Sequence, residues 1–377
     1  MATAERGSAS DADADLRVLA VESSCDETAV AIIEGGRTIA ASVVASQTPL
    51  HAPTGGIVPE VAARAHLRWM LPVLDEALDR AGLTSAADVD AIAVTNGPGL
   101  AGSLLVGLSM AKTLAFLHDR PLVAVNHLEG HLHAAWLLER DESSPAPTFP
   151  AIGLVVSGGH TLLVEMRGPL DYRLLGRTVD DAAGEAFDKV GRMLGLPYPG
   201  GPAIQIASEA WIAAHGGAHG PSDGTVGAQA PLPRAWLGET LDFSFSGLKT
   251  AVRRRLIEAC GGTADDGVFI PDELVGGLAA AFQASVVEVL ATKTTMAAER
   301  TSARSIIVGG GVAANAALRE ALGERAAALG AELIVPRPSL CTDNAAMIGA
   351  AGSLRFLAGE RAGLDLSASP SLRLVAG

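Results

Sequence analysis

The sequence predicts an α/β protein of two related lobes, and three observations support this fold class. At 377 residues, the chain is long enough for two lobes with separate hydrophobic cores. Apolar runs and breakers alternate in a strand-and-helix order. A strand, a polar turn and a second strand open each half, at Arg17–Val21 and Ala29–Ile33 and again at Ala151–Val156 and Thr161–Met166. The halves share no sequence repeat, so we infer two structurally related lobes, with a ligand expected in a cleft between them.

The other elements follow in a regular order. Residues 62–78 are predicted to be helical because four leucines recur there at helical spacing. Leu100–Leu117 is the most apolar stretch, but Ser103, Ser109, Lys112 and Thr113 interrupt it, so we expect a buried amphipathic helix and no membrane span. The remaining elements are the predicted strands Asp90–Val94, Pro121–Val125, Arg304–Val308 and Glu332–Val335, and the predicted helices from His127, over Ala313–Leu329 and over Asn344–Leu357.

The proline-rich and charged segment 140–150 is predicted to link the lobes. We therefore expect an N-terminal lobe over residues 17–139 and a C-terminal lobe over residues 151–340. A last helix within 341–359 is predicted to cross to the cleft or close it, and residues 360–377 are expected to form a tail.

Two segments are predicted to lie outside this framework. Residues 1–16 are small, polar and acidic, which predicts a disordered extension; they have neither the basic start nor the apolar core of a signal peptide. Residues 214–240 are rich in Gly, Pro and Ala and are predicted to form a loop or insertion, to which we assign no role.

Composition limits the partners and the compartment. Three cysteines, Cys25, Cys260 and Cys341, lie far apart without a CxxC motif, which fits a reduced cytoplasm. The formal net charge is -14, whereas a protein that binds nucleic acid unaided usually carries a basic face. The one dense basic cluster is Arg253–Arg255 with Lys249 one turn earlier. It is either a solvated helix face or a local contact for a polyanion.

His127 and His131 form the most informative motif for function. Four residues apart on a helix, they lie on one face about one turn apart. Two neutral imidazole nitrogens can then hold one divalent metal ion, with Asp343 as the best candidate for a third ligand. Gly130 is a poor helix former, and close approach of the backbone to a ligand is one reason for a glycine there. The competing interpretation is a pair of ordinary helix-surface histidines.

Three glycine-rich turns indicate a nucleotide or phosphate site. The strand ending at Val308 runs into Gly309–Gly311 and a helix, where free backbone N–H groups attract anions and Asn315 can offer an amide to a sugar or base. Ser157-Gly158-Gly159 lies in a hairpin turn, and Tyr198–Pro202 is the third such segment. None of these is a GxGxxG or P-loop motif. Together with the repeated strand opening, they favour a nucleotide held between two lobes.

The motifs together resemble one family, the bacterial TsaD family of tRNA threonylcarbamoyladenosine transferases, over about Arg17 to Leu357. The matching segments are Val21–Thr28, Asn96–Gly99, Asn126–His131, Val156–His160, Asp181–Lys189, Tyr198–Pro202, Phe243–Lys249, Gly310–Asn315 and Thr342–Ala345.

The resemblance implies a two-lobed actin-like and sugar-kinase-like (ASKHA) ATPase fold. It implies that His127, His131 and Asp343 hold one divalent metal ion, with Fe(II) expected and Zn(II) the alternative. An archaeal branch has a metal-binding tyrosine about where Val155 stands, so any fourth ligand here is expected to be water or substrate. The residues that fall on the family's substrate contacts are Val155, Val156, Ser157, Gly158, Gly159, Asp188, Gly201 and Asn315.

The implied reaction moves a threonylcarbamoyl group from threonylcarbamoyl-AMP to the N6 amine of the adenosine next to the anticodon, and AMP leaves. The codons read by the modified tRNAs begin with adenine. The implied partners are tRNA, a TsaB-like paralogue and a TsaE-like ATPase, in the cytoplasm and away from membranes. The catalytic base is not identified; Asp26 and Glu27 in the opening turn are candidates for it, or for fixing that turn or binding water around a magnesium ion.

Two other functions were weighed against this one. A metalloprotease of the HExxH type places a glutamate directly after the first histidine, whereas Glu129 here comes second after His127. A non-catalytic scaffold of the same fold would not need both histidines, Asp343 and the glycine turns. Bound metal in the purified protein is the observation that separates the scaffold from the enzyme.

Overall fold

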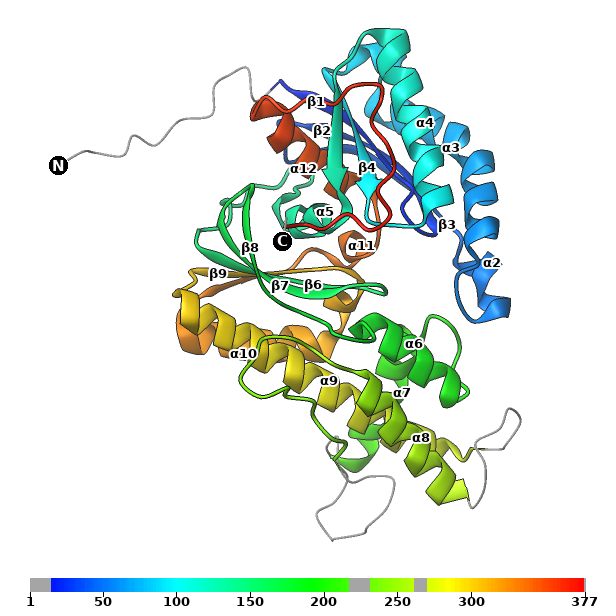
Figure 1. Cartoon of the computed structure of the whole chain (residues 1–377), viewed down its shortest axis with the longest axis vertical. Coiled ribbons are helices and arrows are strands. Elements are labelled where there is room, and N and C mark those ends of the chain that lie inside the picture. Colours follow the sequence, from blue (N-terminus) through cyan, green and yellow to red (C-terminus); the bar gives the residue numbers. More distant parts are fainter. Residues whose placement is uncertain (1–14, 217–230, 261–269, 376–377) are drawn as a thin grey trace, which may run out of the picture. The chain divides into compact units, whose positions relative to one another are not determined.

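The computed structural model describes residues 15–216, 231–260 and 270–375 of the chain (Figure 1). Of the predicted extension 1–16, only Asp15 and Leu16 are among the described residues. Residues 217–230 of the predicted loop 214–240 also lie outside them.

The chain divides into two compact units. Unit 1 comprises Met1–Gln47, Val58–Ala146 and Asp343–Gly377, and unit 2 comprises Thr48–Ile57 and Pro147–Thr342. Each unit is therefore built from more than one stretch of sequence. We still propose lobe boundaries at residues 17–139 and 151–340, as expected from the sequence.

Unit 1 contains a mixed five-stranded sheet with the strand order β3-β2-β1-β4-β5. On one side, β2 is antiparallel to β1 and β3 is antiparallel to β2; on the other side, β4 and β5 are parallel to β1. The strands are β1 (Arg17–Glu22), β2 (Glu27–Glu34), β3 (Thr38–Ser46), β4 (Ala91–Gly97) and β5 (Leu122–Asn126). Because the carboxyl ends of β1, β4 and β5 meet at one edge, the residues that follow these strands are brought together.

Helices cover both faces of this sheet. On one face, Leu19, Val21 and Val94 pack in the core beneath α3 (Pro59–Ala81) and α4 (Ala101–His118). The alternate strand residues face α12 (Ala345–Leu357), whose Gly349 lies against Ile33 and Ala20. A side chain at Gly349 would overlap Ile33, so the glycine permits α12 to lie directly on the strands. The remaining unit 1 helices are α5 (His127–His133), η2 (Ala86–Asp88) and η3 (Ala134–Trp136).

Unit 2 repeats this sheet arrangement with the order β10-β9-β6-β7-β8. Its first strand is again central, with two antiparallel strands on one side and two parallel strands on the other. The strands are β6 (Ala151–Val156), β7 (Thr161–Gly168), β8 (Asp171–Arg177), β9 (Ser305–Gly309) and β10 (Glu332–Ile334). The predicted duplication of mixed-sheet lobes is therefore confirmed, since the two sheets share both order and strand direction.

The helices of unit 2 enclose a second core that includes Phe187, Phe243 and Phe282. The long helix α9 (Asp272–Thr301; Figure 1) contributes residues to this core, Phe282 among them. The helical elements are α2 (Thr48–His51), η1 (Ala52–Thr54), α6 (Ala183–Met193), α7 (Gly200–His215), α8 (Ser246–Cys260), α9 (Asp272–Thr301), η4 (Gly311–Ala314), α10 (Ala316–Leu329) and α11 (Pro338–Cys341).

Two helices, α4 and α9, are long and apolar enough to cross a membrane by length and composition alone. In α9, 72% of the most apolar 18-residue stretch is buried inside the protein, as in a core helix. In α4 the share is 39%, because Leu105, Phe116 and Leu117 are exposed while Leu104 and Leu108 are buried. The helix predicted at Leu100–Leu117 is confirmed, but only one of its faces is buried.

Candidate functional site

The candidate metal centre lies at the edge of the unit 1 sheet where β1, β4 and β5 end. Helix α5 begins directly after β5, and the Asn126 side chain caps it by accepting a hydrogen bond from the Leu128 N–H at 2.9 Å. The helical spacing places the rings of His127 and His131 edge to face, with centroids 4.7 Å apart. Both side chains are almost fully buried, so the interpretation as helix-surface histidines is wrong.

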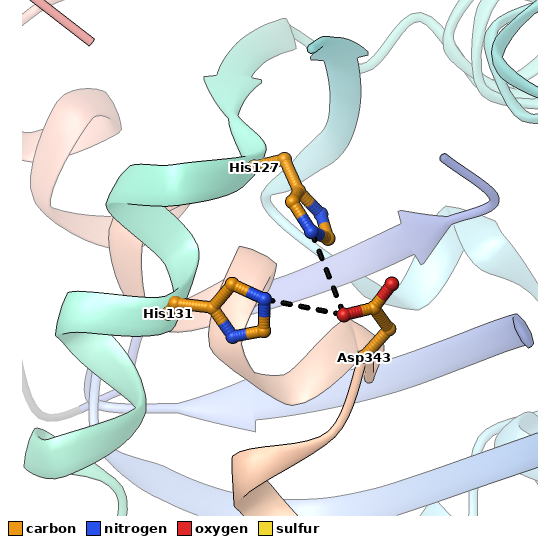
Figure 2. Close-up of side chains that lie close together, drawn as sticks. All are labelled: His127, His131 and Asp343. Atoms are coloured by element: carbon orange, nitrogen blue, oxygen red, sulfur yellow. Dashed lines mark ion pairs between the residues drawn. The ribbon is translucent and has the colours of Figure 1, made fainter. Parts of the chain in front are cut away.

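Asp343 reaches the two histidines from the segment just before α12 (Figure 2). Its Oδ1 lies 3.5 Å from His127 Nε2 and 3.1 Å from His131 Nε2. One ligand atom from each of the three residues lies within 4.8 Å of the other two. The structure thus brings Asp343 to two histidines more than two hundred positions earlier in the chain, in an arrangement that suits a single metal ion.

Burial and neighbouring charges shift the pKa values of Asp343, His127 and His131. Burial by itself would raise the pKa of Asp343, but His127 and then His131 outweigh it and hold the pKa well below its usual value. Burial would lower the pKa of His127, but Asp343 and Glu22 raise it well above the ordinary value. Burial lowers the pKa of His131 despite the nearby carboxylate. The carboxylate is therefore ionised and available as a ligand.

The surroundings of the two ring nitrogens of His131 indicate whether a metal ion fits this centre. Its ring is fully buried, yet neither nitrogen makes a hydrogen bond to any residue in the described part of the chain. Nε2 faces only the Asp343 carboxylate at 3.1 Å, and Nδ1 has no hydrogen-bond partner among the described residues. Such a buried imidazole is costly, because burial removes its hydrogen bonds to water. A metal ion on Nε2, facing Asp343, would satisfy that nitrogen. The donor set therefore fits a divalent ion.

Glu22, to which the sequence assigned no role, also belongs to this centre. Its fully buried carboxylate accepts hydrogen bonds from the Ser24 N–H, from Thr95 Oγ1 at 2.6 Å and from His127 Nδ1 at 3.0 Å. The only signal in the sequence was an acidic residue directly after an apolar strand, which many surface turns also show. Burial of this residue depends on the neighbouring strands and cannot be read locally.

Glu129 and Gly130, which lie between the histidines, have structural roles. Glu129 is fully buried and pairs with Arg355, whose Nε and Nη2 lie 2.6 and 3.1 Å from its two oxygens. This pairing leaves Glu129 unsuited to act as the base of a metalloprotease. The expectation that Gly130 permits close approach to a ligand is wrong: an added Cβ would lie 2.7 Å from Ile348, so the glycine permits α12 to pack on α5.

The opening turn carries the two candidate bases. Glu27 accepts a hydrogen bond from Ser46 Oγ at 2.9 Å. Burial, followed by the charges of Asp26 and Asp343, raises the pKa of Glu27 to about 10. With no cation at Asp343, the Glu27 carboxyl group therefore retains a proton near neutral pH.

In unit 2, two of the predicted phosphate turns lie side by side. The Ser157–His160 turn follows β6 and the Gly309–Asn315 loop follows β9, and these strands are parallel neighbours. The Ser157 carbonyl accepts the Gly184 N–H at 3.2 Å at the start of α6. Gly310 has φ 95° and packs against the Val156 backbone, so a side chain there would overlap it. Gly158, Gly159 and Gly311 instead have open space around them, as a ligand-facing backbone requires.

Asn315 lies in the same region with both ends of its amide engaged. The helix predicted from Ala313 begins at Ala316, with η4 before it, because Asn315 Oδ1 caps α10 by accepting the Leu318 N–H at 3.0 Å. Its Nδ2 donates to Gln283 Oε1 at 2.8 Å, and Gln283 Nε2 donates to Ser208 Oγ at 3.1 Å. This buried network joins α7, α9 and α10 beneath the glycine loop.

The other predicted substrate residues differ in which of their groups a ligand could contact. Val155 and Val156 are fully buried strand residues, so only their backbone is available. Asp188 Oδ1 accepts the Gly200 N–H at 2.8 Å and so fixes the start of α7. Gly201 has open space around it in the first turn of α7. Gly201 therefore belongs to the third glycine turn, and Asp188, on α6, holds that turn through Gly200.

The basic cluster on α8 is smaller than the sequence suggests. Lys249 Nζ lies 3.1 Å from Asp181 Oδ2, so its charge is already paired. Arg255 donates to the Pro231 carbonyl at 2.8 Å. Arg253 and Arg254 are exposed, and Arg254 makes only a surface contact of 3.6 Å with Glu258.

Comparisons with known proteins identify the family. The sequence model of TsaD, described as tRNA N6-adenosine threonylcarbamoyltransferase, matches residues 38–350. A Thermomicrobium roseum protein named tRNA N6-adenosine threonylcarbamoyltransferase is 52% identical, covering 95% of this chain and 97% of its own. A Bacillus subtilis protein of the same name is 47% identical, covering 96% of each.

A comparison of structures confirms the predicted ASKHA fold. The crystal structure of T. kodakarensis HypF aligns with 92% of this chain and 48% of its own, at 15% identity and a TM-score of 0.56. At this identity the likeness shows the fold alone, whereas the sequence matches cover nearly the whole chain at about half identity. The chain belongs to the TsaD family and is an enzyme, a tRNA N6-adenosine threonylcarbamoyltransferase.

Proposed function

We propose that this enzyme takes its threonylcarbamoyl group from threonylcarbamoyl-AMP and transfers it to the adenosine next to the anticodon of tRNAs that read codons beginning with adenine. The N6 amine attacks the carbamoyl carbonyl, a C–N bond forms, the bond from that carbon to the phosphate oxygen breaks, and AMP leaves. The amine is a weak nucleophile, so the step needs a polarised carbonyl and a stabilised leaving group.

The adenylate phosphate is proposed to bind at the glycine turns of unit 2. The backbone N–H groups of Gly158, Gly159 and Gly311 border open space and suit an anion. Asn315 would contact the nucleoside only by giving up its hydrogen bond to Gln283. Asp188 would act through the Gly200–Gly201 turn that it already fixes.

The metal ion is proposed to be held by His127, His131 and Asp343, and when bound it would supply Lewis-acid polarisation of the reacting carbonyl. Two histidines and one carboxylate with open positions suit Fe(II), and Zn(II) is the alternative. Water or substrate would complete the coordination, since Val155 provides no ligand atom.

The amine proton is proposed to leave to Asp26. With no cation at Asp343, Glu27 carries a proton near neutral pH, so in that state it can donate a hydrogen bond but cannot accept the amine proton. Asp26 is the last residue of the turn after β1, and Glu27 is the first residue of β2. Asp26→Asn should therefore lower kcat, with a smaller change in the KM for the adenylate.

The tRNA is proposed to bind with the help of partners. Phosphate contacts dominate nucleic-acid affinity, and a chain of net charge -14 with two exposed arginines on α8 offers few of them. Aromatic residues make up only 4% of the chain, so base stacking cannot compensate. We place the protein in the cytoplasm, with its tRNA substrates.

The partners are proposed to be a TsaB-like paralogue and a TsaE-like ATPase. An exposed apolar surface on two neighbouring helices supports a protein partner for unit 1: Leu67 and Leu71 on α3, and Leu105, Phe116 and Leu117 on α4. The helices approach closely, since an added Cβ at Gly102 would lie 3.1 Å from Ala63 (Figure 1). Exposed apolar patches of this kind mark interaction sites. Leu71→Glu should weaken binding of the paralogue without changing metal content.

The clustering of three ligand atoms within 4.8 Å at the end of the parallel strands is the observation that carries the proposed chemistry. The experiment is transfer of labelled threonine, through threonylcarbamoyl-AMP, to tRNA with and without the partner proteins. Label in the adenosine next to the anticodon is expected with the complete system. Label that remains on free threonine or appears at another nucleoside would contradict the proposal.

A further inference from the structure

The carboxylate of Glu22 is a buried charge that the proposed chemistry does not use. It is fully buried at the last position of β1. A buried carboxylate is retained only where hydrogen bonds or opposite charges compensate for lost hydration. All of its described contacts lie within unit 1, so the role of this charge is sought among those neighbours.

The strand register explains why Glu22 meets His127. Val21 pairs with Val94 across β1 and β4, and Thr95 pairs with Val125 across β4 and β5. Glu22, Thr95 and the residues after Val125 therefore follow one another along the same edge of the sheet. Because Val21 and Val94 face the core under α3 and α4, Glu22 and Thr95 point to the opposite face, where α12 lies.

The hydrogen bonds give the two carboxylate oxygens separate functions. Oε1 accepts the backbone N–H of Ser24 and ties the side chain to the opening turn. Oε2 accepts Thr95 Oγ1 at 2.6 Å and His127 Nδ1 at 3.0 Å. When the ring is neutral, as a metal ligand must be, an Nδ1–H directed at Glu22 leaves the lone pair of His127 on Nε2, which lies 3.5 Å from Asp343 Oδ1.

We propose that Glu22 is a positioning residue that fixes the tautomer and ring orientation of His127 for metal binding, with Thr95 holding its carboxylate in place. This inference rests on the proposed metal site. A carboxylate behind a ligating histidine sets which nitrogen is free and increases the basicity of the ligand. His131 has no such partner among the described residues, so the two histidines are not equivalent.

The geometry distinguishes this role from a purely structural one. Thr95 Oγ1 and His127 Nδ1 share one oxygen, and Ser24 Oγ also lies 3.1 Å from His127 Nδ1. Loss of the carboxylate would leave the serine hydroxyl as the partner of Nδ1. Since a hydroxyl can donate as well as accept, the ring would then be free to adopt either tautomer.

The test measures Zn(II) and Fe(II) affinity by competition with a chelator in the full-length protein. Glu22→Gln is expected to weaken affinity about 10- to 100-fold, and Thr95→Val is expected to give a smaller loss that Thr95→Ser restores. Glu34→Gln is the matched control, because Glu34 also ends a strand of this sheet but pairs with Arg17 at 3.2 Å.

A second readout follows the histidine itself. In the zinc-loaded wild type with ¹⁵N-labelled histidine, NMR should show His127 protonated at Nδ1 with a strongly downfield proton, and Glu22→Gln should move that resonance upfield. Unchanged affinity and an unchanged resonance in Glu22→Gln would overturn the inference and leave the metal site standing. A wild type that binds neither ion would overturn the metal site itself. If Glu22→Gln does not fold, equal affinities in Thr95→Val and Thr95→Ser would overturn the inference.

Discussion

Replacing Arg355 with methionine should destabilise unit 1 far more than a salt-bridge deletion on the surface does. Arg355 contacts both oxygens of Glu129, and Glu129 has no exposed surface. The substitution leaves a buried carboxylate without its cation, which typically costs about 3–5 kcal/mol. The second contact of Arg355, with Glu360, is half exposed and contributes little.

The consequence should extend to the metal centre, because the ion pair joins the two elements that carry the ligands. Glu129 lies on α5 between His127 and His131, and Arg355 lies on α12, which Asp343 directly precedes. Loosening α12 from α5 changes the distance between the histidines and the carboxylate. We therefore expect weaker metal binding from a substitution twelve positions from the nearest ligand.

Native-state hydrogen exchange is the suitable assay, since a chain of two units need not unfold in one step. At about 1.4 kcal/mol per decade, protection of the α5 amides should fall by roughly two to three and a half decades. Arg64→Met is the matched control, because its ion pair with Glu60 is exposed on both sides and should be worth under about 0.5 kcal/mol. Equal losses in the two variants would refute the reasoning. Glu129→Leu combined with Arg355→Met should recover much of the loss.

Three further predictions concern the ligand sites. Gly158→Val should lower affinity for ATP or an adenylate analogue at least tenfold by calorimetry without lowering Tm, because the glycine borders open space; unchanged affinity would place the phosphate elsewhere. Charge reversal at Arg253 and Arg254 should raise the tRNA KM of the assembled system several-fold and leave metal content intact; unchanged tRNA kinetics would make the cluster a solvated helix face. Deleting residues 365–377 removes the Arg373 carbonyl that accepts from Asn126, so Tm and metal affinity should both fall, and wild-type values would contradict this role of the tail.

The sequence predicted those parts of the site that local spacing determines. The pairing of His127 with His131 follows from one helical turn, and the tight turn at Ser157 follows from two glycines between apolar strands. Asp343 was the best candidate for the third ligand from the sequence, the family resemblance implied the same residue, and the structure brings the three residues together.

The parts that depend on packing were missed or misread. The edge strands β3 and β8 were not predicted, because β3 is rich in alanine and serine and β8 is largely exposed. Glu22 was given no role, since its burial requires β4 and α5 as neighbours. For Gly130 the sequence offered close approach to a ligand as one reason, whereas the structure gives close packing against α12. In each case the deciding contact comes from a residue distant in sequence.

The central claim is that transfer depends on a metal ion held by His127, His131 and Asp343. The most direct measurement is metal occupancy and threonylcarbamoyl transfer in the same samples of wild type, His131→Ala and Asp343→Ala, after chelation and stepwise reloading with Fe(II) or Zn(II). We expect about one ion per wild-type chain, transfer that rises in proportion to occupancy, and sharply reduced metal content in both variants. Full occupancy in either variant, or full transfer by the chelated wild type, would contradict it.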